Sequence, residues 1–398
     1  MLNRDALREA TRLTRAGQLT EATALLQRML RGERAPAAAS PAPSPMSLPG
    51  RASDTIDLKA NGVSNADRAT PIEAPSASDA ARRRRSLFNR AKDGTWLGLQ
   101  GAKNAPTSMT DIAPEGTKFI DGSYSDKAGS RTYKLFIPSG YHQGQPLPLV
   151  VMLHGCTQSP DDFAAGTRMN FIAEEQTCLV VYPAQPSSAN PSKCWNWFRP
   201  DDQSRDKGEP SLIAGITRQV MQDYSVDPKR IFVAGLSAGG AAAAVLGATY
   251  SDLYAAVGIH SGLAYGAADD MPSAFAAMRQ GGGPGSRAIP DGPTLPAIIF
   301  HGDSDTIVHP INGAQAVEQA VGSTKTQKKV RRGQMPGGHK YTRTIHAEGE
   351  IEFLEHWNIH GAGHAWSGGS PAGSYTDPEG PDATKEMLRF FLKHPQPH

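Results

Sequence analysis

The sequence predicts an α/β protein built on a mostly parallel central sheet with helices on both faces. After about residue 110, short and almost wholly apolar segments alternate with segments of helical periodicity. Continuous apolar runs are typical of strands covered on both faces, and their alternation with helices favours parallel pairing through right-handed crossovers. The chain has 398 residues, of which 38% are hydrophobic and 20% are charged, so it can bury a sizeable core.

Composition excludes several classes of protein. The 41 Lys and Arg residues nearly balance the 39 Asp and Glu residues, and a net charge of +2 gives no overall attraction to nucleic acid. No run of eighteen apolar residues occurs, so we expect no membrane-spanning helix. Three cysteines are too few for a disulfide scaffold, although one bridge is possible. No Cys/His spacing is typical of a metal site, and we expect no metal and no cofactor.

The first residues predict a helical hairpin. Residues 1–32 carry apolar side chains at helical spacing, with a break at Ala16-Gly17 and a stop at Gly32. Its apolar face needs a cover, so the hairpin is a candidate docking or dimerising element. The chain starts Met1-Leu2-Asn3-Arg4-Asp5 without the apolar run of a signal peptide, which predicts a cytoplasmic protein.

Residues 33–110 are predicted to be a flexible linker. Ala35 to Gly50 alternates Ala, Ser and Pro, and the only aromatic residues of the segment are Phe88 and Trp96. Such a segment buries too little apolar surface to offset its ordering entropy. A basic run at Arg82 to Arg85 is interpreted as a solvated charge run rather than a contact with an anionic surface.

Residues 111–398 are predicted to form the α/β domain. An antiparallel pair at Lys118–Ile120 and Arg131–Ile137 opens it. The apolar strands expected next are Leu147–Leu153, Leu179–Tyr182, Ile231–Ala234, Ala256–Ile259, Ala297–Phe300 and Ile351–Trp357. The helices expected with them are Asp162–Ala173, Pro210–Tyr224, Ala238–Tyr250 and Ala383–Lys393. Catalytic groups of such a sheet belong on loops at the carboxyl ends of the strands.

One serine has the setting of a catalytic nucleophile. Gly235-Leu236-Ser237-Ala238-Gly239 follows a predicted strand and precedes an Ala-rich helix. This strand–turn–helix context is the one that a nucleophile elbow requires, with glycines that let the two backbones approach. We therefore predict Ser237 as the nucleophile, which needs a base to remove its proton.

The best candidate base is His364. It lies in a loop of small residues after the strand that ends near Trp357, where a substrate can reach it. His154 and His301 each follow an apolar strand directly and are interpreted as strand-end packing or loop hydrogen bonds. We predict that His364 activates Ser237.

A carboxylate should hold the imidazole in the correct tautomer, and the loop after Phe300 offers two. We choose Asp305, which lies far enough past the strand to turn back toward His364. Asp303 is the alternative, as a turn-forming residue if it is not the acid. The chain order Ser237, Asp305, His364 is typical of the α/β-hydrolase triad.

Acyl transfer also needs donors for the developing oxyanion. The backbone amide of Ala238, directly after the nucleophile, is one candidate. The other is the amide of Cys156 in the loop after Leu153, where Gly155 allows a tight turn.

Together these residues resemble the poly(3-hydroxybutyrate) depolymerase family of esterases, a group similar to carbohydrate esterases that release feruloyl or acetyl groups. The resemblance spans roughly residues 116–393. It rests on motifs in order: Leu153-His154-Gly155-Cys156-Thr157-Gln158, Cys194-Trp195-Asn196-Trp197-Phe198, Gly235-Leu236-Ser237-Ala238-Gly239-Gly240 and His301-Gly302-x-x-Asp305. The family implies an α/β-hydrolase fold and gives the same roles to Ser237, Asp305 and His364, with the Cys156 and Ala238 amides as the oxyanion hole.

The resemblance implies a serine esterase that works through an acyl-enzyme on polyhydroxyalkanoate, poly(3-hydroxybutyrate) or its oligomers. A short-chain carboxylesterase of feruloyl or acetyl type is the alternative, and the same chemistry would serve a peptidase. A non-catalytic granule-associated docking protein is the rival from another class, with the hairpin at 1–32 docked on a partner or polymer granule. Secreted depolymerases differ in having a signal peptide and a polymer-binding domain, so the extracellular location is the alternative to the cytoplasmic one.

Other residues near these motifs have open interpretations. Cys156 and Cys194 either form a disulfide that pins the aromatic loop beside the oxyanion hole or remain reduced thiols. Cys178 starts an apolar strand and is predicted to be a buried thiol. Trp195 and Trp366 are predicted to bind substrate by lining an acyl or alcohol pocket.

Overall fold

The structure, a computed structural model, describes residues 108–282 and 294–397. The hairpin predicted at 1–32 and the linker predicted at 33–110, up to residue 107, lie outside the described residues. The division of the chain at residue 110 therefore stays a prediction. A short helix, α4 (Met109–Ile112), precedes the first strand.

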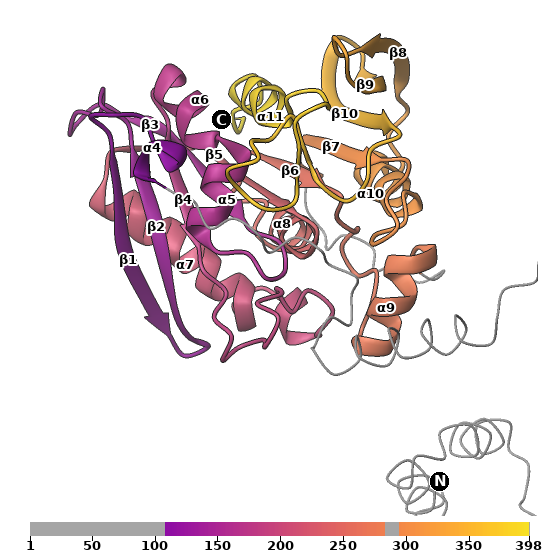
Figure 1. The fold of residues 1–398 in the computed structure, drawn as a ribbon. Coiled ribbons are helices and arrows are strands. Elements are labelled where there is room, and N and C mark those ends of the chain that lie inside the picture. The colour runs from indigo at the N-terminus through magenta and orange to yellow at the C-terminus, as the bar shows by residue number, and fades with distance from the viewer. Residues whose placement is uncertain (1–107, 283–293, 398) are drawn as a thin grey trace, which may run out of the picture. The chain divides into compact units, whose positions relative to one another are not determined.

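A ten-stranded sheet forms the centre of the described domain (Figure 1), in the order β1-β2-β4-β3-β5-β6-β7-β10-β9-β8. The neighbours from β4 to β10 in this order all pair in parallel. Antiparallel pairs flank them at both ends. The strands are β1 (Lys118–Asp126), β2 (Gly129–Ile137), β3 (Leu147–Leu153), β4 (Leu179–Pro183), β5 (Val226–Leu236), β6 (Ala256–His260), β7 (Ala297–Gly302), β8 (Gln327–Gln334), β9 (Lys340–Glu348) and β10 (Ile351–His360). The mostly parallel sheet predicted from the apolar runs is confirmed.

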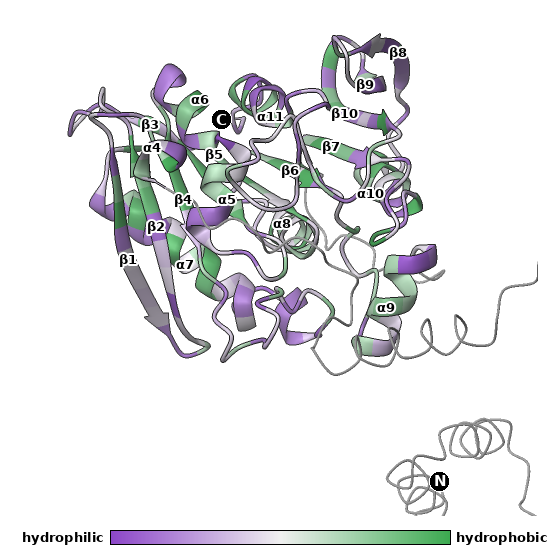
Figure 2. Ribbon diagram, in the orientation of Figure 1, coloured by the Kyte–Doolittle hydropathy of each residue, from purple (hydrophilic) through white to green (hydrophobic). Residues whose placement is uncertain are grey.

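The central strands are buried on both faces, as β3 shows. Leu149, Val151 and Leu153 pack into one hydrophobic core, and Val150 and Met152 pack into the other. All of them are fully buried, since alternate side chains of a strand point to opposite faces. Figure 2 shows the consequence: the middle of the sheet is hydrophobic, whereas β8 at its edge is largely hydrophilic.

Helices cover both cores (Figure 1). The core that contains Leu149 is closed by α7 (Gly208–Asp223), α8 (Ala238–Thr249), α9 (Met271–Gln280) and α10 (Ile311–Val321). The core that contains Val150 is closed by α5 (Pro160–Thr167), α6 (Met169–Gln176) and α11 (Ala383–Leu392). The remaining elements are η1 (Asp201–Gln203) and a two-stranded pair, β11 (Trp366–Ser367) and β12 (Thr376–Asp377).

The structure differs from the sequence prediction in one helix and in a hairpin that was not predicted. The helix expected over Asp162–Ala173 is two helices, because Arg168 adopts a left-handed conformation (φ 56°) that caps α5 and starts α6. The antiparallel hairpin of β8 and β9 was not predicted from the sequence. Strand β8 reads QKKVRRGQ and is almost wholly exposed, so it lacks the apolar run by which the central strands were recognised.

Among the described residues, no helix combines the length and the apolar character that crossing a bilayer requires.

Candidate active site

Ser237 lies on a sharp turn between β5 and α8. Its backbone has φ 58° and ψ −119°, a conformation that a residue with a side chain adopts only at a cost in strain. The Ser237 amide donates to the His260 carbonyl at 2.9 Å, which holds the turn against β6. A Cβ on Gly239 would lie 2.0 Å from the Leu153 carbonyl oxygen, and one on Gly235 would lie 2.3 Å from the Gly239 carbonyl carbon. Only glycine fits at these two positions, because three backbones converge there.

The structure brings Asp305 and His364 together. His364 Nδ1 lies 2.7 Å from Asp305 Oδ2, and both side chains are buried. Asp305 Oδ1 accepts from the amides of Ile307 and Val308, each at 2.9 Å. The two loops meet because they leave adjacent parallel strands, β7 and β10, and the Ser304 amide donates to the Ala362 carbonyl between them.

The electrostatics keep Asp305 ionised. Burial alone would raise the pKa of Asp305, but hydrogen bonds from His301, His364 and the Val308 amide outweigh it and hold the pKa well below its usual range. An ionised carboxylate can only accept, so His364 Nδ1 must donate to it. In the neutral imidazole this leaves Nε2 as a proton acceptor.

Asp303, the alternative acid, has other partners. Its carboxylate accepts from His360 Nδ1 at 2.8 Å and from the Gly361 amide at 2.7 Å. The contact of Asp303 is therefore with the start of the loop that carries His364 and not with His364 itself. His154 and His301 are both buried and bond to backbone groups, His154 through Gly155 and Gln185, and His301 through Val308.

Ser237 and His364 line one cavity of about 330 Å³ that opens to solvent. Cys156 and Gly155 border it on the side of β3, and its other walls are Leu236, Met278, Ile307 and Tyr375. His364 is its single titratable group apart from the Tyr375 phenol. Met278, Ile307 and Tyr375 were not predicted as lining residues. Met278 lies on α9, a helix that was not predicted from the sequence.

Several polar groups beside this cavity make no hydrogen bond with other described residues. Within the described residues, the amides of Cys156 and Ala238 make no hydrogen bond, and the Ser237 hydroxyl makes none with His364. Ala238 begins α8, where the first amides of a helix have no partner within the helix. Two free N–H groups and a free hydroxyl thus lie around one small space.

Cys156 and Cys194 form a disulfide in the structure. The bridge joins the loop after β3 to the loop after β4 and resolves the open interpretation in favour of a bonded pair. Cys178 is a free thiol, and burial raises its pKa to about 12.

Trp195 and Trp366 do not line the cavity, which corrects the prediction that they contact substrate. Trp195 is 0% exposed and Trp366 is 1% exposed. The Trp195 indole N–H donates to the His154 carbonyl, and that of Trp366 donates to the Thr384 hydroxyl. Their polar atoms are thus satisfied inside the protein, and both rings serve as core that supports the site loops.

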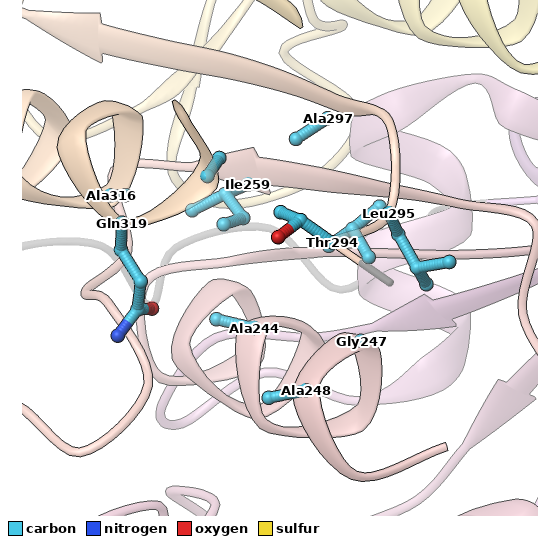
Figure 3. A pocket seen from close by; sticks show the side chains of 11 residues that line it. Ala244, Gly247, Ala248, Ile259, Thr294, Leu295, Ala297, Ala316 and Gln319 are labelled. Atoms are coloured by element: carbon cyan, nitrogen blue, oxygen red, sulfur yellow. The ribbon is translucent and has the colours of Figure 1, made fainter. Parts of the chain in front are cut away.

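A larger cavity of about 430 Å³ lies between α8 and α10 (Figure 3). Small and aliphatic side chains such as Ala244, Ile259 and Ala316 line it, and none of its lining side chains is charged. It holds no nucleophile, acid or base of the kind found beside Ser237. Within residues 108–282 and 294–397, no group of three or more His, Cys, Asp or Glu side chains is placed to hold a metal ion.

Comparison with known proteins agrees with this geometry. The chain is 37% identical over 193 residues to poly(3-hydroxyalkanoate) depolymerase C of Paucimonas lemoignei, which covers 46% of each chain. It is 29% identical to feruloyl esterase B of Thermothelomyces thermophilus, over 43% of this chain and 64% of that one. The match therefore spans less than two thirds of the length of either relative.

Among solved structures, an acetyl xylan esterase from Aspergillus awamori superposes with a TM-score of 0.53 at 19% identity, covering 69% of this chain and 99% of that one. This likeness confirms the α/β-hydrolase fold. Residues 131–325, which include Ser237, Asp305 and the Cys156 loop, match the family described as "Esterase PHB depolymerase". Through this segment, the chain is similar to the esterase PHB depolymerase family.

Proposed function

We propose that the protein is a serine hydrolase of carboxylic esters that acts through an acyl-enzyme. The observation that carries this proposal is the Asp305–His364 hydrogen bond at 2.7 Å, beside a cavity that His364, Ser237 and Cys156 line. The family match supports the same chemistry. A non-catalytic docking protein would have no use for this combination of groups.

In this mechanism, His364 Nε2 takes the proton from Ser237 Oγ as the oxygen attacks the ester carbonyl carbon. The amides of Cys156 and Ala238 donate to the oxyanion of the tetrahedral intermediate. The intermediate expels the alcohol, which receives the proton from His364. Water then attacks the acyl-enzyme. His364 takes the proton from this water and returns it to Ser237 Oγ as the carboxylic acid leaves.

Attack requires the Ser237 hydroxyl to donate to His364, and both side chains line the same cavity. Catalytic hydrogen bonds often tighten only when the substrate is bound. Asp305 accepts the Nδ1 proton throughout and stabilises the imidazolium that forms.

The cavity walls favour a neutral acyl group. Leu236, Met278 and Ile307 are apolar, and no lining side chain carries a permanent charge to bind an anionic substrate. We infer that polyhydroxyalkanoate, and poly(3-hydroxybutyrate) or its oligomers in particular, is the substrate, which the depolymerase relative of P. lemoignei supports.

A short-chain carboxylesterase of feruloyl or acetyl type is the second candidate. One observation is consistent with it: the Tyr375 phenol at the cavity wall is hydrogen-bonded to the Thr157 hydroxyl at 3.2 Å, so a polar group borders the space for the substrate. The feruloyl esterase relative is consistent with this alternative.

The disulfide bears on location. A Cys156–Cys194 bridge persists in oxidising compartments and is rare in the cytosol, so we favour the extracellular alternative over the cytoplasmic one.

Replacing Ser237 with Ala is expected to lower kcat/KM for p-nitrophenyl butyrate on the order of 10³-fold or more, because the nucleophile is lost. The variant should keep the circular dichroism spectrum and melting temperature of the parent. Ser304→Ala, which removes an exposed hydroxyl, serves as the control and should stay active. Covalent labelling of another serine by a fluorophosphonate would contradict the assignment.

Replacement of Asp305 should lower kcat far more than replacement of Asp303. Asp305→Asn is expected to lower kcat roughly 10³- to 10⁴-fold, because the amide no longer holds His364 in the tautomer that accepts a proton. Asp303→Asn removes a contact with His360 and Gly361 and should lower kcat about tenfold at most. Steady-state kinetics on one soluble ester compares them, and the reverse order of losses would make Asp303 the acid.

Substrate class can be separated by one series of assays. The protein should release acid from amorphous poly(3-hydroxybutyrate) granules and from soluble hydroxybutyrate oligomers faster than from methyl ferulate or acetylated xylan. Peptide p-nitroanilides test the peptidase alternative and should not be cleaved. Preference for ferulate or acetyl esters over oligomers would favour the second candidate.

The first hundred residues should not be needed for turnover of small esters. All the residues assigned to the site lie after residue 150, so removal of residues 1–100 should leave kcat/KM for p-nitrophenyl butyrate within a few-fold of the full chain. If the 1–32 hairpin docks on a granule, the same truncation should slow granule hydrolysis, because tethering raises the local enzyme concentration. Loss of small-ester activity in a folded truncated protein would show that this region completes the site.

A further inference from the structure

We propose that Glu209 is a positioning residue that fixes the oxyanion amide of Cys156 through the loop of residues 185–196 and its disulfide. This inference rests on the proposed function, since it concerns the same oxyanion hole. Glu209 lies in the first turn of α7 and does not line the cavity.

The 185–196 loop is fastened to the oxyanion loop, residues 154–157, in four ways. The Cys156–Cys194 disulfide is the covalent one. The Gln185 amide donates to His154 Nε2 at 3.1 Å, and the Trp195 indole donates to the His154 carbonyl at 3.0 Å. The Thr157 amide donates to the Ser192 carbonyl at 2.7 Å. The position of the Cys156 amide therefore depends on the position of this loop.

His154 takes part in this attachment as a neutral ring. Burial lowers its pKa to about 4, so Nε2 is free to accept from the Gln185 amide. Nδ1 then carries the proton and donates to the Gly155 carbonyl at 2.7 Å, within the oxyanion loop itself.

Glu209 in turn anchors the 185–196 loop at both of its ends. Its carboxylate accepts from the Asn196 amide at 2.7 Å, from Asn196 Nδ2 at 2.7 Å and from Gln185 Nε2. Gln185 Nε2 also donates to the Cys194 carbonyl at 2.9 Å. One buried carboxylate thus ties together the two ends of the segment that carries the bridging cysteine.

The partners of Glu209 favour its ionised form. Each of its three hydrogen bonds comes from an N–H group, and Arg131 Nη2 lies 3.6 Å away. The amide of Gln185 cannot flip to accept, because its oxygen already accepts from Arg131 Nε at 3.0 Å. Burial, and after it the negative charge of Asp202, raises the pKa of Glu209 to about 7. The hydrogen bonds from Asn196 and Gln185 act in the opposite direction and favour the ionised carboxylate. A buried charge of this kind is retained where its hydrogen bonds hold a structure together.

The position of an oxyanion donor matters because its strength depends on geometry. Removing one such donor costs about 10²- to 10³-fold in kcat, and a small displacement costs part of that. The ester binds through other contacts, so we expect the loss in kcat and not in KM.

Glu209→Gln tests the proposal, because it keeps the volume but replaces one accepting oxygen with a donor. We expect kcat for p-nitrophenyl butyrate to fall on the order of 10- to 100-fold with little change in KM. Affinity for a trifluoromethyl ketone, whose adduct with Ser237 carries an oxyanion, should fall in proportion.

Glu355→Gln is the matched control. Glu355 is another buried carboxylate with three N–H donors, from Arg343, Arg389 and Trp357, and none of these residues lines the cavity. This variant should lower the melting temperature without lowering kcat of the folded protein. Asn196→Ala removes the Nδ2 contact with Glu209 and the hydrogen bond that Asn190 Nδ2 donates to Asn196 Oδ1, and it keeps the Asn196 amide contact with Glu209. It provides a milder variant should Glu209→Gln not fold, and a smaller fall in kcat is expected.

The Cys156→Ser/Cys194→Ser double variant tests whether Glu209 acts on the Cys156 amide through the disulfide. It keeps both backbone amides, and the effect of Glu209→Gln on kcat should be smaller in this background than in the parent, because part of the connection is already cut. Wild-type kcat and ketone affinity in folded Glu209→Gln or Asn196→Ala, or full independence of the two changes, would overturn the positioning role. A wild-type protein inactive on every ester would instead overturn the proposed function.

Discussion

The close approach of three backbones at the end of β5 is the constraint on which the site depends. Gly239 at the start of α8 packs against the Leu153 carbonyl at the end of β3, and Gly235 packs against Gly239. No side chain fits between them, and Ser237 takes a strained turn conformation with φ 58° and ψ −119°. The same contact sets the loop after β3, with Cys156, beside the first free amide of α8. The residues proposed as nucleophile and oxyanion donors are therefore positioned by one packing contact between the adjacent parallel strands β3 and β5.

The residues proposed as acid and base, Asp305 and His364, are positioned by a second pairing, that of β7 with β10. Their register puts Gly302 opposite Ile359, so the loops that follow start side by side. A Cβ on Gly302 would lie 2.3 Å from the Ala362 carbonyl, which shows how tightly the two loops are packed. Strands β3 and β7 are buried along their whole length, and β10 is buried at alternate residues near its end. A rigid core thus supports loops whose side chains carry the chemistry.

Sequence patterns predicted the parts of this arrangement that local spacing determines. Ser237 was recognisable because the glycines around it serve a backbone need, and His364 because it follows a strand in a loop of small residues. Trp195 and Trp366 were misplaced because proximity to a motif does not tell which way a ring points, and both point into the core. Glu209 was missed for a related reason: its partners Gln185 and Asn196 lie 24 and 13 residues away in sequence, and the motif that contains Asn196 does not show which carboxylate it contacts. Strand β8 was not predicted because an exposed edge strand has no regular pattern of apolar residues.

The domain holds two Asp–His pairs on the same two loops, and burial separates their roles. Asp303 and His360 are part-exposed, where water competes for the hydrogen bond and weakens the field of the carboxylate. Asp305 is inaccessible to solvent and is held by two backbone amides as well as by His364, so its charge acts on the imidazole in a low-dielectric space. An imidazolium formed at His364 during acyl transfer would be stabilised there far more than at His360. The exposed pair is better suited to hold the loop, because Asp303 also binds the Gly361 amide three residues before the base. The same residue types in the same segment can thus serve as clamp and as catalyst, and the surrounding dielectric decides between them.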